Sequence, residues 1–113
     1  MKQIKAYIKP HKLSQVTRAL HKVDGLTGMS VTEVKGFGRS RAKNAPHRII
    51  EDFVEYVPHV KIEIVCENGL LDTIVRTIQE NAHTGLRGDG KIYILAVEDA
   101  IRIENGDRGE HAC

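Results

Sequence analysis

Apolar and polar residues alternate along four stretches of the chain, residues 2–9, 29–34, 57–66 and 91–97. A period of two places successive side chains on opposite faces of a strand, so each stretch is predicted to be a strand of a sheet. The first strand is expected to end at Pro10, because a proline has no backbone N–H to donate to a neighbouring strand.

Two other stretches, residues 13–23 and 70–82, repeat their apolar residues at helical spacing and are predicted to be amphipathic helices. Asn68 is expected to cap the second helix, and Gly85 to follow its last turn. The resulting order is strand, helix, strand, strand, helix, strand. It predicts an α+β fold, a ferredoxin-like βαββαβ sandwich, in a single domain over residues 1–113.

Two segments show no sustained period. Residues 39–52 are rich in basic side chains, contain Pro46 and end in two acids, and we expect them to form a long exposed loop. Residues 105–113 are rich in turn-forming residues and are expected to be a flexible tail.

Two helices cover only one face of a four-stranded sheet, so the composition of the other face is informative. This open face is predicted to mix apolar and charged side chains, namely Tyr7, Val65, Tyr93, Leu95 and Val97 with Lys5, Lys61 and Glu63. It is too apolar to be left wholly in water, and we expect another subunit against it.

Composition narrows the class of protein. The 113 residues carry 17 basic and 15 acidic side chains, with three Tyr, two Phe and no Trp. Neither a basic excess nor a stacking surface is present, which disfavours nucleic-acid binding. No apolar run approaches the roughly 20 residues that span a bilayer, and the first residues alternate like a strand rather than a signal peptide. A cytoplasmic protein is expected.

The stretch TGLRGDGKIY, residues 84–93, places two glycines around one acid immediately before a strand. Glycine allows positive φ and close backbone approach. Such a turn suits a plain connection between elements. It also suits a phosphate site, in which backbone amides and the following Lys91 would hold the anion.

Four motifs together resemble the PII signal-transduction proteins: MSVTEVKGFGR at 29–39, VKIEIV at 60–65, TGLRGDGKIY at 84–93 and IRI at 101–103. The resemblance runs essentially from end to end of the chain. It implies a homotrimer that binds adenine nucleotides in clefts between subunits. It also implies that a long loop, approximately residues 38–56, contacts a partner protein.

The resemblance also assigns nucleotide-binding residues. The matching positions are Gly36, Gly38 and Arg39 at the base of the loop, Gly88, Asp89, Gly90 and Lys91 on the glycine turn, Arg102 on the last short strand, and Ile8, Gly28, Met29, Ser30 and Val65 around the base and ribose. Ser40, next to Arg39, is a further candidate for the nucleotide site.

Four positions depart from the family pattern. Asp52 stands in place of the tyrosine that is nucleotidylated in many bacteria, so uridylylation is not expected there. Ser40 replaces a glutamine that helps to hold magnesium and 2-oxoglutarate, His59 replaces a lysine that neutralises 2-oxoglutarate, and Glu104 replaces an arginine facing the phosphates. Together these changes argue against 2-oxoglutarate sensing and favour ADP or AMP over ATP.

The leading hypothesis is therefore a nucleotide-gated regulator of a transport or inorganic-carbon-related system, whose partner is a membrane transporter or a carbon-fixation component. Bicarbonate is a candidate small anion at Arg39, Ser40 and Lys91. Two alternatives stay open. One is a metal-efflux-linked relative that binds metal through His111, Cys113 and Cys66; the other is a conventional 2-oxoglutarate and ATP sensor of nitrogen. The sequence shows no catalytic constellation, so no enzyme activity is expected.

Overall fold

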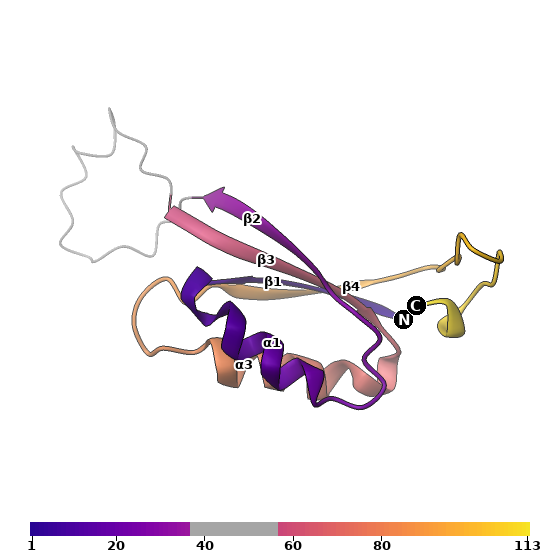
Figure 1. Cartoon of the computed structure of the whole chain (residues 1–113), viewed down its shortest axis with the longest axis horizontal. Helices are drawn as coiled ribbons and strands as arrows, with labels where there is room; N and C mark the ends of the chain where they lie inside the picture. Colours follow the sequence, from indigo (N-terminus) through magenta and orange to yellow (C-terminus); the bar gives the residue numbers. More distant parts are fainter. Residues whose placement is uncertain (37–56) are drawn as a thin grey trace.

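A computed structural model describes residues 1–36 and 57–113. Its sheet contains four strands, β1 (Lys2–Ile8), β2 (Ser30–Gly36), β3 (Val57–Cys66) and β4 (Lys91–Ala96). They lie in the order β2-β3-β1-β4, and every neighbouring pair is antiparallel. This arrangement confirms the predicted α+β, ferredoxin-like fold (Figure 1).

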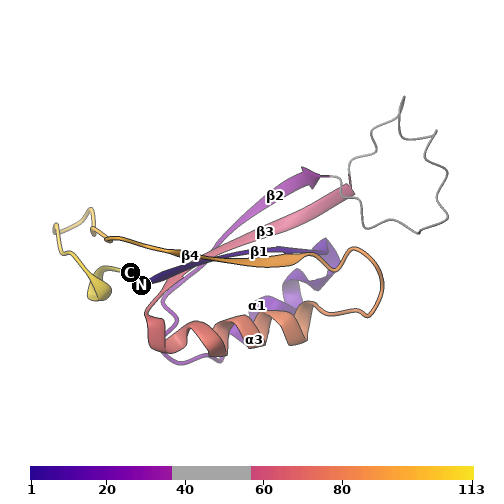
Figure 2. The same ribbon diagram turned by 180° about the vertical axis from the view of Figure 1, so that it is seen from behind.

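Helices α1 (Leu13–His21) and α3 (Leu71–Ala82) pack side by side against one face of the sheet (Figures 1 and 2). Short 3₁₀ helices, Pro10–Lys12 and Asn68–Leu70, precede them. The described ranges contain no helix of the length and apolarity that crossing a membrane requires.

Two details at the helix ends differ from the sequence expectation. Helix α1 ends at His21, two residues early, because the Lys22 N–H turns back onto the carbonyls of Ala19 and Leu20. Asn68 is not a cap; it begins the 3₁₀ helix and makes no side-chain capping bond. Helix α3 ends at Ala82 as predicted, because His83 takes an extended backbone conformation.

The core lies between the sheet and the two helices. The strand pairing Ile4–Ile64 and Ala6–Ile62 aligns the apolar positions of β1 and β3 on the helix-covered face. The buried side chains are those of Ile4, Ala6, Ile8, Val16, Leu20, Val60, Ile62, Ile64, Cys66, Ile74, Ile78 and Ala82. The alternating pattern thus identified the buried face of both strands.

The open face has the predicted mixture of side chains. Tyr93 and Leu95 are 49% and 39% exposed, and the Tyr7 and Tyr93 rings meet edge to face with centroids 6.1 Å apart. Beside them, Lys61 Nζ lies 3.0 Å from Glu63 Oε1. The subunit expected to cover this face stays a prediction.

The chain after β4 folds back on itself. Ile101 and Arg108 form an antiparallel bridge, and the Arg102 N–H donates to Asp107 O at 2.8 Å. A 3₁₀ helix, Glu110–Ala112, follows. The last short strand, which carries Arg102, is therefore one arm of a small hairpin, while the mobility expected of the tail stays a prediction.

Candidate functional site

The predicted site residues that the structure describes lie at two opposite ends of the sheet (Figure 1). Ile8, Gly36 and the glycine turn 88–91 lie where β1 and β2 end and β4 begins. Residues 28–30 and Val65 lie at the other end, where β2 begins and β3 ends. Val65 pairs with Gln3 and Lys91 with Tyr7, a separation of four positions along β1, or roughly 13 Å. One chain does not bring the two groups together.

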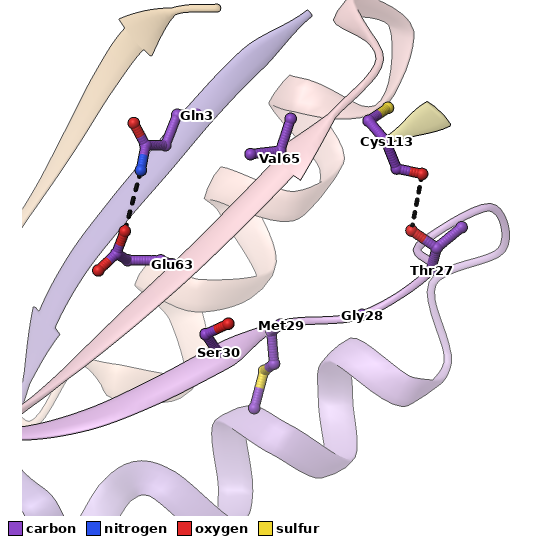
Figure 3. Close-up of a pocket in the computed structure, with 8 residues that line it drawn as sticks. All are labelled: Gln3, Thr27, Gly28, Met29, Ser30, Glu63, Val65 and Cys113. Carbon is purple, nitrogen blue, oxygen red and sulfur yellow. Dashed lines mark hydrogen bonds between the residues drawn. The ribbon is translucent and has the colours of Figure 1, made fainter. Parts of the chain in front are cut away.

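One of these ends holds a pocket of about 420 Å³, a size suited to a small-molecule ligand (Figure 3). Four of the residues that the resemblance assigns to the base and ribose line it together, Gly28, Met29, Ser30 and Val65; their role in binding stays a prediction. The complete lining is Gln3, Thr27, Gly28, Met29, Ser30, Glu63, Val65 and Cys113.

The polar groups of the pocket centre on the Glu63 carboxylate. Gln3 Nε2 donates to Glu63 Oε2 at 3.0 Å (Figure 3). Lys61 Nζ lies 3.0 Å from the other carboxylate oxygen. The hydrogen bond from Lys61 lowers the pKa of Glu63, which keeps the carboxylate ionised as an acceptor. Sequence reasoning missed Gln3 and Glu63 as pocket residues, although their alternation with the core residues placed both on the open face beside Val65.

The C-terminal segment closes one side of this pocket. Thr27 Oγ1 donates to the backbone oxygen of Cys113 at 3.3 Å (Figure 3). Arg102 Nη2 donates to His111 O at 2.9 Å. The guanidinium predicted to bind nucleotide is thus engaged by the chain's own tail, at the end of the sheet away from the glycine turn.

The candidate metal ligands do not form a set of three within the described residues. Cys66 and Cys113 are both free thiols, and burial raises the pKa of Cys66. His111 is exposed. Within residues 1–36 and 57–113, no three His, Cys, Asp or Glu side chains are grouped to hold a metal ion.

At the other end of the sheet, the glycine turn has the predicted backbone. Gly88 and Gly90 adopt φ values of +78° and +102°. A Cβ on Gly90 would lie 1.6 Å from Tyr7 O. No side chain fits there, so this glycine is required by the approach of β4 to β1.

The Asp89 side chain points into its own turn rather than away from it. Its carboxylate accepts the N–H groups of Thr84 and Gly85 at 2.9 and 3.2 Å, and Lys9 Nζ lies 3.2 Å away. The Thr84 hydroxyl, foremost among these donors, holds the pKa of Asp89 well below its usual range.

His59 of β3 lies beside the same turn. Its Nδ1 is 3.4 Å from Val57 O and its Nε2 is 3.4 Å from Gly88 O. Ile8 is only 1% exposed and belongs to the core, so its side chain offers no surface to a ligand in this chain. The predictions for Gly38, Arg39 and Ser40 lie outside the described residues, and the anion cluster with Lys91 stays a prediction.

Comparisons with known proteins agree with this architecture. Residues 1–107 match the family model "Nitrogen regulatory protein P-II". The chain is 49% identical to Nitrogen regulatory protein P-II of Rhodospirillum rubrum and 49% identical to Nitrogen regulatory protein P-II 1 of Escherichia coli (strain K12), in both cases over 112 residues and 99% of each chain. A crystal structure of Arabidopsis thaliana PII bound to citrate superposes with a TM-score of 0.79 and 38% identity, covering 98% of this chain and 90% of that one. The chain therefore belongs to the nitrogen regulatory protein P-II family.

Proposed function

We propose that this protein is a PII-type regulator that binds an adenine nucleotide, ADP or AMP in preference to ATP, in clefts between the subunits of a homotrimer. The observation that carries the proposal is the pocket formed by residues 27–30 with Glu63 and Val65. It gathers, in one cavity, residues that the family resemblance assigns to the base and ribose.

The charge of the pocket suits the neutral part of a nucleotide. Glu63 is ionised and would repel a phosphate, but it can accept hydrogen bonds from ribose hydroxyls or a base amino group. Val65 supplies apolar surface for the base, whereas the Met29 side chain points toward helix α1 (Figure 3) and packs against the core. The phosphates would then bind at a glycine turn, where Lys91 is exposed and close backbone approach is possible.

The separation of these two half-sites supports binding between subunits. Within one chain they lie at opposite ends of the sheet (Figure 1). A second copy packed against the open face would bring its own glycine turn to the pocket of the first. Tyr93 and Leu95, both substantially exposed, provide apolar surface for that contact.

The preference for ADP or AMP rests on charge. Glu104 is exposed and stands where the family pattern has an arginine facing the phosphates. An acid near a γ-phosphate would disfavour ATP by about 1–4 kcal/mol for a close pair at intermediate effective dielectric.

The regulated partner would be contacted through residues 38–56 and would belong to a transport or inorganic-carbon-related system. Bicarbonate is the proposed small anion, held by Arg39, Ser40 and Lys91, whose donors suit a carbonate-type oxyanion. Metal binding through Cys66, Cys113 and His111 is a weaker alternative, since nothing in the described geometry favours it.

Calorimetric titration with ADP, AMP and ATP tests the proposal, each with and without bicarbonate and with and without magnesium and 2-oxoglutarate. We expect ADP or AMP to bind more tightly than ATP, with bicarbonate strengthening binding and 2-oxoglutarate having no effect. Magnesium-ATP binding enhanced by 2-oxoglutarate would instead identify a conventional nitrogen sensor. Absence of binding by any adenine nucleotide would refute the proposal.

A variant locates the base pocket. Val65→Trp fills the cavity from β3 and should abolish nucleotide binding while leaving the buried core intact. Val31→Trp is the matched control, because Val31 is 43% exposed on β2 and does not line the pocket. Equal affinity in the two variants would place the nucleotide elsewhere.

A further inference from the structure

We infer that Lys9, Thr84 and Asp89 form a clamp that positions the glycine turn for phosphate, and that Asp89 is a positioning residue rather than a ligand. The inference rests on the proposed function for the identity of the ligand. The clamp itself is a property of the unliganded chain and can be tested separately.

Both carboxylate oxygens of Asp89 are engaged within the chain. Oδ1 accepts the Thr84 hydroxyl and lies 3.2 Å from Lys9 Nζ. Oδ2 accepts the backbone N–H groups of Thr84 at 2.9 Å and Gly85 at 3.2 Å, and His83 Nδ1 is 3.4 Å away. A nucleotide would have to displace several of these donors to use Asp89 as an acceptor.

Thr84 ties the remaining part of the turn to the same carboxylate. Its hydroxyl accepts the N–H of Leu86 at 3.0 Å and a hydrogen bond from Lys9 Nζ at 3.1 Å. The amides of residues 84, 85 and 86 are therefore bound by the clamp. Asp89 and Thr84 do not bind the amides of Gly88 and Gly90, in contrast to those of residues 84–86.

The clamp fixes the turn to the end of β1 at two points. Lys9, immediately after β1, pairs with Asp89. Two residues earlier, Tyr7 O lies against Gly90, and Tyr7 pairs with Lys91 at the start of β4. Both attachments are made by residues 7–9 at the end of β1. We therefore expect the Lys9–Asp89 ion pair to help set the orientation of Lys91.

Charge gives the pair a second effect. An unpaired carboxylate beside bound phosphate would repel it, whereas Lys9 neutralises Asp89 at 3.2 Å. The side chains of Lys9 and Asp89 are 18% and 25% exposed. Because they are partly shielded from water, the attraction between them is less screened than between fully exposed charges.

The first experiment measures amide hydrogen exchange across residues 84–91 in the unliganded full chain. Asp89→Asn and Lys9→Met should each accelerate exchange at Thr84 and Gly85 by about tenfold, because each loses part of the clamp. Lys12→Met is the control, since Lys12 contacts Gln15 and not the turn. Exchange in Asp89→Asn and Lys9→Met at the wild-type rate would overturn the clamp.

The second experiment titrates the same proteins with ADP. Both clamp variants should bind ADP about tenfold more weakly, and the double variant should be no weaker than the worse single variant, because both substitutions remove one interaction. If Asp89→Asn weakened ADP binding and Lys9→Met did not, Asp89 would be a direct ligand and the positioning role would be wrong. Wild-type protein that bound no adenine nucleotide while the exchange result held would refute the proposed function and leave the clamp standing.

Discussion

The carbonyl oxygen of Tyr7 lies where a side chain at residue 90 would have to begin: a Cβ built on Gly90 would be 1.6 Å from it. Gly90 also has a φ of +102°, a conformation that is strained for any residue with a Cβ. The junction of β1 and β4 therefore depends on the absence of a side chain at this position.

Gly90→Ala should lower the free energy of unfolding by about 3 kcal/mol or more, since steric overlap with backbone adds to the left-handed strain. Thermal unfolding followed by circular dichroism measures this effect. The control is Gly69→Ala, because a Cβ on Gly69 would have no neighbour within 4 Å. Similar melting temperatures for the two variants would show that the junction tolerates a side chain.

Asp89 should contribute to the acid limb of the stability profile. Its pKa lies below the ordinary 3.8 in the folded protein because Thr84, Lys9 and Gly85 bind the ionised form. As the pH falls, the Asp89 carboxylate is therefore protonated at a higher pH in the unfolded chain than in the folded protein. The stabilisation is present above about pH 4 and is lost progressively below it.

Urea unfolding between pH 6 and pH 2.5 measures this dependence. Asp89→Asn should be less stable than wild type at pH 6, with the difference shrinking as the pH falls. Asp24→Asn, at an exposed position, serves as the control. A constant difference between Asp89→Asn and wild type across the range would contradict the assignment.

The two cysteines should differ sharply in reactivity. Cys66 is 3% exposed and burial raises its pKa, whereas Cys113 lies partly exposed beside the pocket. The thiolate is the reactive form, so a thiol reagent should label Cys113 rapidly in the native protein and Cys66 only after unfolding. Mass spectrometry of labelled peptides distinguishes the two, and equal native rates would contradict the burial of Cys66.

The core prediction concerns Ile62, which is 0% exposed in the middle of β3. Ile62→Ala should cost about 2–5 kcal/mol through lost burial and the cavity left behind. Ile103→Ala is the matched control, since Ile103 is fully exposed at 101%. Denaturant unfolding that found the two variants equally stable would place the core elsewhere.

The open face provides a test of self-association. Leu95→Glu puts a charge on the open face opposite Gln3 of β1, where the proposed trimer would bury it without a compensating partner. Analytical ultracentrifugation should show a shift from trimer toward monomer with secondary structure retained. Ser14→Glu, on the exposed side of α1, should leave the trimer intact; an unchanged mass for Leu95→Glu would exclude this face as the interface.

The sequence by itself determined the elements and their buried faces. Strand β3 has the predicted bounds Val57–Cys66, and Ile4, Ala6 and Ile8 are buried as their alternation indicated. These features are readable because a period of two or of 3.6 residues directly records which side of an element meets the core. The glycine turn was readable for a similar reason, because positive φ has a local sequence signature.

Only the tertiary structure decided which side chains from different elements contact one another. It directs Asp89 onto Lys9 and Thr84, buries Ile8 away from ligand and engages Arg102 with His111. It also joins Gln3 and Glu63 across 60 positions of sequence in one pocket. A linear pattern records burial but not the identity of a partner, because which donor reaches which acceptor is settled only when distant segments pack together.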